Sequence, residues 1–127
     1  RGTVLHIARK AASLMIEAYD CDPTQLVAGI GPSISQAAFE VGEEVVKAFQ
    51  MAGFPMERIL RRNAETQKAH IDLWETNRLQ LLEAGLLSGH IEIAGICTYI
   101  RYEDYFSARR LSVKSGRILT GICLKKS

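Results

Sequence analysis

Residues 91–110 read Ile-Glu-Ile-Ala-Gly-Ile-Cys-Thr-Tyr-Ile-Arg-Tyr-Glu-Asp-Tyr-Phe-Ser-Ala-Arg-Arg. The first part of this stretch is apolar and rich in β-branched residues, which predicts a buried strand over 91–97. Aromatic residues follow the strand, and the stretch ends with the pair Arg109-Arg110. Because ligands of open α/β sheets bind outside the carboxyl ends of the strands, this arrangement indicates an anion-binding site. A second interpretation stays open, in which the aromatic residues cap a core and the arginines pair with surface carboxylates.

The composition is that of one folded domain. The 127 residues are 47% hydrophobic and 24% charged, with a net charge of +2, which suits a single hydrophobic core. The 16 basic residues are interspersed with 14 acidic ones, so no nucleic-acid partner is predicted. No apolar run reaches the ~18 residues of a membrane span, so no membrane partner is predicted either. Three widely spaced cysteines without a C-x-x-C pair favour a cytoplasmic location.

Outside this stretch, the sequence predicts helices that alternate with strands. Apolar residues recur at helical spacing from Thr3 to Tyr19, and His6 falls on the polar face, where we predict it to be solvated. A short strand is predicted over 26–30, and the Gly-Pro-Ser that follows is either a plain turn or a loop that approaches a ligand. The other predictions are a helix from Glu43 to Gly53, an exposed loop over 61–68, a helix from Asp72 through Ala84 and a strand over 117–124. This order predicts an α/β fold with helices against a mixed sheet.

Five motifs follow one another along nearly the whole chain. They are Arg1-Gly2-Thr3; Ile30-Gly31-Pro32-Ser33-Ile34 with Phe39-Glu40-Val41-Gly42; His70-Ile71-Asp72-Leu73-Trp74 with Asn77 and Gln80-Leu81; Cys97-Thr98; and Phe106-Ser107-x-Arg109-Arg110 with Ser115-Gly116-Arg117. In this order they resemble the laccase-domain family of bacterial proteins. The resemblance implies the layered helix/mixed sheet/helix arrangement of the laccase-domain type. It also implies that residues 1–127 are a single domain, the carboxyl-terminal part of a larger laccase-type domain whose amino-terminal part is missing here.

The resembled family was first labelled multicopper polyphenol oxidoreductase and later described as a purine nucleoside phosphorylase with adenosine deaminase activity. The implied partners are therefore a purine nucleoside and phosphate. Zinc or copper is implied for the full-length protein, with metal ligands that lie upstream of this chain, so we expect this chain alone to be inactive. Aromatic rings can stack on a base, and the planar fork of arginine grips phosphate oxygens in pairs. On this basis we assign substrate binding to Arg1, Tyr99, Phe106, Ser107, Arg109 and Arg110.

The copper-oxidase label does not fit the residues of this chain. Laccase copper centres need many imidazoles, commonly in His-x-His pairs, and the chain has three histidines and no such pair. Two alternatives stay open: a non-catalytic binding or assembly module whose arginines contact a partner protein, and a thiol enzyme with Cys97 as nucleophile. For Cys97, a buried inert thiol is the favoured interpretation. Because apolar strands need cover on both faces, we also expect an unpaired sheet edge and self-association of the isolated chain.

Overall fold

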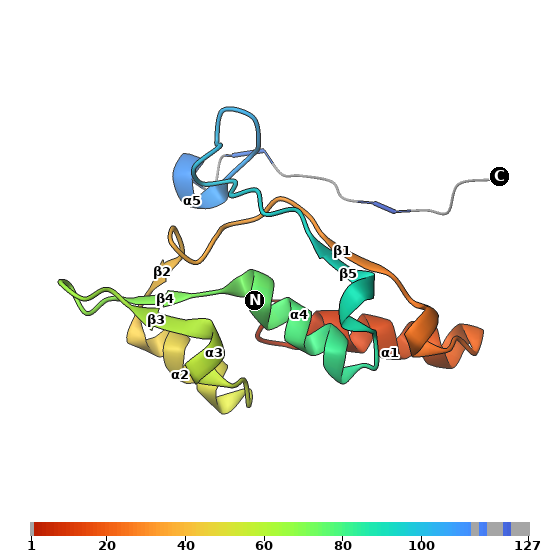
Figure 1. Ribbon diagram of the computed structural model, residues 1–127. Coiled ribbons are helices and arrows are strands. Elements are labelled where there is room, and N and C mark those ends of the chain that lie inside the picture. The colour runs from red at the N-terminus through yellow and green to blue at the C-terminus, as the bar shows by residue number, and fades with distance from the viewer. Residues whose placement is uncertain (1, 113–114, 117–120, 123–127) are drawn as a thin grey trace.

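The computed structural model describes residues 2–112, 115–116 and 121–122 (Figure 1). In chain order its elements are α1 (Ile7–Tyr19), the 3-10 helix η1 (Pro23–Gln25), β1 (Ala28–Ile30), β2 (Glu40–Val41), α2 (Glu43–Met51), α3 (Met56–Ile59), β3 (Leu60–Arg62), β4 (Ala69–Ile71), α4 (Leu73–Glu83), the 3-10 helix η2 (Ser88–His90), β5 (Ile91–Ile93) and α5 (Ala108–Leu111). The predicted α/β class is confirmed. Within the described residues, however, the strands form two small sheets and not one mixed sheet.

The parallel sheet joins β1 to β5. Ala28 pairs with Ile91 and Ile30 with Ile93, and among the described residues an isolated bridge from Ser33 to Cys97 continues the pairing. Both strands are therefore shorter than the apolar runs predicted. Because the two strands run in the same direction, their carboxyl ends and the loops that follow them lie together.

The antiparallel sheet has the order β2-β4-β3. Its strands cover the main core cluster, which consists of the buried residues Phe49, Phe54, Ile59 and Ile71. Helices α2 and α3 lie on one side of this sheet (Figure 1). The loop predicted over 61–68 is indeed exposed, but its first two residues belong to β3 and pair with β4.

Helix α1 begins later than the periodicity predicted. Residues 2–6 form turns, and His6 adopts a left-handed conformation with φ 58°. His6 is not solvated as predicted: its ring stacks on Phe54 with the ring centroids 4.6 Å apart, and its Nε2 lies 3.0 Å from the Ala52 carbonyl oxygen. The prediction was wrong because it placed residue 6 on a helix, whereas a turn directs the side chain onto the end of α2.

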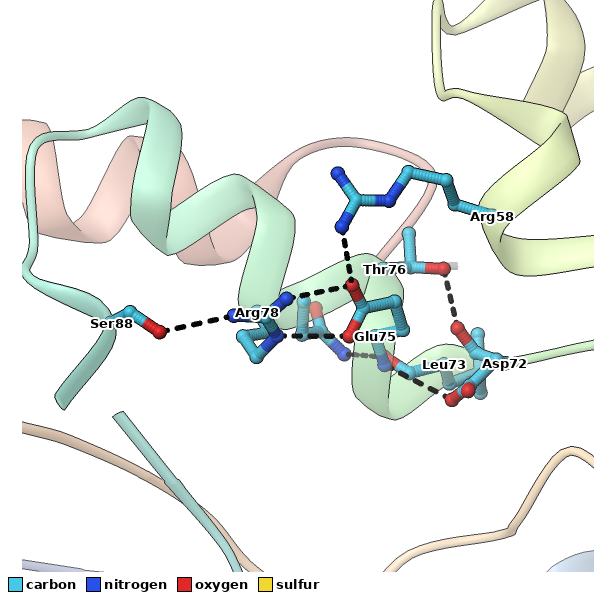
Figure 2. Close-up of polar contacts among 8 residues, drawn as sticks. Arg58, Asp72, Leu73, Glu75, Thr76, Arg78 and Ser88 are labelled. Atoms are coloured by element: carbon cyan, nitrogen blue, oxygen red, sulfur yellow. Dashed lines mark hydrogen bonds and ion pairs between the residues drawn. The ribbon is translucent and has the colours of Figure 1, made fainter. Parts of the chain in front are cut away.

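Helix α4 joins the two halves of the structure. Asp72 caps it as predicted, since its carboxylate accepts a hydrogen bond of 3.0 Å from the Glu75 backbone N–H. Gln80 is fully buried and donates to the Thr3 carbonyl oxygen at 3.0 Å, which fixes the turn before α1. On the outer side, Figure 2 shows Glu75 between Arg58 and Arg78, with Arg78 also reaching Ser88. The helix is thereby attached to the turn before α1, to α3 and to η2.

The remaining predictions concern the chain's end and membranes. The strand predicted over 117–124 falls largely outside the described residues. Among the residues that the structure does describe, no helix is long and apolar enough to cross a membrane.

Candidate functional site

The loops after β1 and β5 are held against each other by the backbone. Ser33 donates from its N–H to the Ile96 carbonyl at 3.1 Å, and Thr98 donates to the Ser33 carbonyl at 3.2 Å. The Ser33 hydroxyl also accepts a hydrogen bond of 2.7 Å from the Trp74 indole N–H on the first turn of α4. The Gly-Pro-Ser loop and the start of the aromatic segment are therefore one rigid unit at the carboxyl ends of the parallel strands.

Cys97 belongs to this unit. Its Sγ accepts a hydrogen bond of 3.3 Å from the Ser35 backbone N–H, and the residue is 8% exposed. Burial acts to raise the pKa of the thiol, but hydrogen bonds from Ser35 and from the backbone of Ile100 and Tyr99 outweigh it and hold the pKa below its ordinary value. A thiol that is buried and bonded in this way is closed to a substrate, which favours a positioning role over nucleophilic attack.

Ser107 connects the aromatic segment to α5. It is 5% exposed, and its hydroxyl accepts a hydrogen bond of 3.3 Å from the Arg110 backbone N–H, so it caps this one-turn helix. The predicted substrate residue Ser107 thus has a clear structural role in orienting Arg109 and Arg110.

Arg109 reaches back to the second motif of the sequence. Its Nη1 donates to the Glu40 carbonyl oxygen at 2.9 Å, and the centre of its guanidinium lies 5.0 Å from the ring centroid of Phe39. The contact links α5 to the start of β2. In the sequence, Phe39 and Glu40 stood out only as part of a motif. Their contact with Arg109 could not be predicted, because the partners are far apart in the chain.

Arg110 lies among tyrosines of the aromatic segment. The centre of its guanidinium is 4.8 Å from the ring centroid of Tyr99 and 4.4 Å from that of Tyr102. Hydrogen bonding to the two hydroxyls raises the pKa of Arg110 above its ordinary value, so the group is cationic at any working pH.

The predicted substrate residues are thus partly brought together. Tyr99, Ser107 and Arg110 are in contact, Arg109 lies on the same helix, and Arg1 is outside the described residues. Phe106 is 54% exposed, and its ring packs so closely on Gly116 that an added Cβ there would lie 2.7 Å from it. Within the described part of the chain, neither Arg109 nor Arg110 forms an ion pair with a carboxylate.

A metal ion in a protein is held by several side chains that converge on one point. Protein zinc and copper sites need three or more His, Cys, Asp or Glu side chains that converge. No such group occurs in residues 2–112, 115–116 and 121–122. These residues therefore do not fit the zinc or copper that the resemblance implies.

Sequence and structure comparisons identify relatives along the whole chain. A purine nucleoside phosphorylase of Bacteroides thetaiotaomicron is 56% identical over 126 residues, which is 99% of this chain and 47% of the relative. Adenosine deaminase RL5, from an unknown prokaryotic organism, is 43% identical over 98% of this chain and 47% of its own length. The crystal structure of YlmD from Geobacillus stearothermophilus superimposes with a TM-score of 0.75 at 32% identity, over 87% of this chain and 41% of YlmD.

These relatives are more than twice as long as the matched region, so the chain spans about half the length of the curated relatives it matches. The family model described as multi-copper polyphenol oxidoreductase laccase matches residues 1–125. This chain therefore belongs to the multi-copper polyphenol oxidoreductase laccase family.

Proposed function

We propose that this chain contributes the phosphate-binding and part of the nucleoside-binding surface of a purine nucleoside phosphorylase. The observation that carries the proposal is the arginine pair on α5, held by aromatic rings, a backbone carbonyl and a buried serine, with no carboxylate partner among the described residues. Relatives named purine nucleoside phosphorylase and adenosine deaminase support it.

The phosphate would be bound by Arg109 and Arg110. Both side chains come from exposed positions of one short helix, and both keep a full positive charge because their partners are neutral. A guanidinium offers five N–H donors in a fixed fork, so groups left free by the aromatic contacts can bind phosphate oxygens in pairs. Arg1 is assigned to the same role from the sequence.

The purine base would stack on Phe106. Its ring is more than half exposed, and Gly116 supports it from one side. An aromatic ring that is fixed on one face and open on the other suits a planar base. Tyr99 is already in contact with Arg110, so its contribution to substrate binding runs through that arginine.

The reaction is a displacement at the sugar carbon of the N-glycosidic bond. A phosphate oxygen forms a bond to that carbon, the carbon–nitrogen bond breaks, and the proton of hydrogen phosphate ends on the base nitrogen. The products are ribose 1-phosphate and the free base. Arginines beside the phosphate align the attacking oxygen, which is their contribution to the rate.

The roles proposed for Arg109, Arg110 and Phe106 do not involve a metal ion. Zinc or copper, which the resemblance implies for the longer protein, would supply an activated water for deamination. We propose that its ligands lie outside this chain, and no step assigned here runs through it. The chain alone is accordingly expected to bind phosphate without cleaving inosine or adenosine.

Binding of inorganic phosphate to Arg109→Gln and Arg110→Gln tests the proposal. We expect each change to weaken phosphate affinity about tenfold, because a charge-assisted contact is lost. Arg101→Gln is the matched control: it removes the same charge from the same segment, but Arg101 already pairs with Asp104 at 2.9 Å. The control should change affinity less than about twofold.

The same variants in the full-length protein should raise the KM for phosphate in inosine cleavage. Saturable phosphate binding that is equally weakened by all three substitutions would reflect net charge alone and would contradict the proposal. No saturable response to phosphate or inosine would favour the alternative of a non-catalytic binding module.

A further inference from the structure

The contact between Arg110 and two tyrosines differs from the contact between Arg101 and Tyr105. Arg101 lies 5.6 Å from the Tyr105 ring and is neutralised by Asp104. Arg110 lies closer to both of its rings, at 4.4 and 4.8 Å, and has no carboxylate partner among the described residues. We name Tyr99 and Tyr102 with Arg110 the tyrosine clamp.

The clamp is anchored to the sheet. Tyr99 and Tyr102 lie on the turns that follow Cys97, and the Arg101 N–H donates to the Cys97 carbonyl at 2.9 Å. Cys97 itself is fixed by Ser35, and Thr98 by Ser33. The two rings therefore stand on the rigid unit at the ends of β1 and β5, whereas Arg110 comes from α5.

A clamp of this kind holds a cation without cancelling its charge. A free arginine side chain has many rotamers, and ordering it on binding costs affinity. A carboxylate could order it, but it would neutralise the guanidinium and compete with a phosphate ligand. Aromatic faces attract the cation, and the two tyrosine hydroxyls that it hydrogen-bonds are neutral, so its charge and its remaining N–H donors stay available to a phosphate.

We propose that Tyr99 and Tyr102 are positioning residues that preorganise Arg110 for a phosphate oxygen. This inference rests on the proposed function, because it takes phosphate as the ligand of Arg110. It assigns to Tyr99 a role through Arg110 in place of contact with the base, and it adds Tyr102 to the site.

A double-mutant cycle with inorganic phosphate as the probe tests the clamp. Tyr102→Leu should weaken phosphate affinity roughly five- to tenfold, because the ring contact is lost while the arginine remains. Tyr102→Phe keeps the ring but removes the hydroxyl that hydrogen-bonds Arg110, so its phosphate affinity should lie between those of the wild type and Tyr102→Leu. In an Arg110→Gln background, Tyr102→Leu should have no further effect. Tyr105→Leu, which removes the ring of the neutralised pair, is the matched control.

Nuclear magnetic resonance of the arginine side chains provides a second readout. The Arg110 Nε–H signal should be shifted by the ring currents of the tyrosines, and the shift should disappear in Tyr102→Leu and persist in Tyr102→Phe. An equal loss of affinity from Tyr102→Leu in both backgrounds would overturn the inference, as would an Arg110 signal at the position of a free arginine. Failure of the proposed function gives a different result: Arg110→Gln would leave phosphate affinity unchanged, although the Arg110 signal of the wild type still showed the ring-current shift.

Discussion

Glu75 is held by two arginines on the first turn of α4. Arg78 donates to both of its carboxylate oxygens at 2.9 Å, and Arg58 lies 3.7 Å away (Figure 2). The hydrogen bonds from Arg78, aided by the charges of both arginines and opposed by partial burial, hold the pKa of Glu75 below its ordinary value of 4.5. The carboxylate is 21% exposed, so solvent screens this ion pair less than the others.

The pH dependence of stability follows from this lowered pKa. The native state favours the ionised form, so the stabilisation is present above pH 4.5 and is lost as the pH falls through the lower native value. We expect Glu75→Gln to lower the free energy of unfolding by about 1 kcal/mol at neutral pH. The difference from the wild type should shrink below pH 4.5, as measured by urea unfolding across the pH range. Glu83→Gln, at an exposed pair with Arg9, should cost less than about 0.5 kcal/mol at every pH.

Among individual residues, the sequence pointed to candidate side chains but not to their contacts. It singled out Arg109, Arg110 and Ser107, because paired arginines after aromatic residues indicate anion binding. It could not assign Phe39 to Arg109, because a ring seventy positions earlier becomes a neighbour only through the packing of α5 against β2. His6 was misjudged because residue 6 lies in a turn and not on the predicted helix.

Helices α2 and α4 end in the same way. In each, the N–H of a glycine and of the residue after it return to carbonyls of the last turn: Gly53 to Gln50 and Phe54 to Phe49 in α2, Gly85 to Leu82 and Leu86 to Leu81 in α4. Both glycines have positive φ, 88° at Gly53 and 105° at Gly85. This is the Schellman motif, which satisfies carbonyls that the helix leaves unpaired.

The two helix ends differ in their surroundings, which makes a controlled comparison possible. A Cβ at Gly85 would lie 2.9 Å from Pro23, whereas one at Gly53 would meet nothing within 4 Å. We expect Gly53→Ala to destabilise by about 1 kcal/mol from the left-handed backbone alone, and Gly85→Ala by about 2 to 3 kcal/mol because a clash is added. Gly89→Ala, with open space and no positive φ, should be nearly neutral. Equal effects of the first two substitutions in thermal unfolding would mean that Pro23 moves aside freely.

At the scale of elements, helices were easier to predict than strands. The cap at Asp72 and the glycines after α2 and α4 gave correct helix ends, because capping is decided by neighbours in sequence. Strands β2, β3 and β4 have two or three residues each, too few to show an alternating pattern, and they exist because they pair with one another. Strands were predicted over 26–30 and 91–97, and the structure has the shorter strands β1 and β5 within these ranges. The length of each strand depends on how far its partner strand pairs with it.

The whole molecule has an apolar groove along its parallel sheet. Its volume is about 740 Å³, and it is lined by α1, β1, β5 and residues beside them, which include Ala8, Met15, Val27 and Ile93. Val27 is 67% exposed and Met15 46%. Parallel sheets are normally covered on both faces. Exposed apolar surface of this extent on the sheet therefore favours association.

We therefore expect the 127-residue chain to self-associate as its concentration is raised. Val27→Lys should reduce the apparent mass in light scattering, because a charge in the groove opposes burial. Met51→Lys is the control, since Met51 is 88% exposed on α2 and lies outside the groove. A monodisperse monomer at all concentrations, or equal effects of both lysines, would contradict a role for the groove.

The contacts of Gln80 bear on how the chain is made. Its amide binds the Thr3 carbonyl and the Arg9 N–H, and the first of these partners lies 77 positions earlier in the chain. A ribosome that adds about 5 to 20 residues per second needs roughly 4 to 15 seconds to synthesise that interval. During this time α1 has emerged, but its residue Ala12 lacks the Leu81 and Leu82 side chains of α4 that belong to the same core cluster. The side of α1 that faces α4 therefore stays uncovered for several seconds of synthesis, and slow codons before α4 would lengthen that exposure.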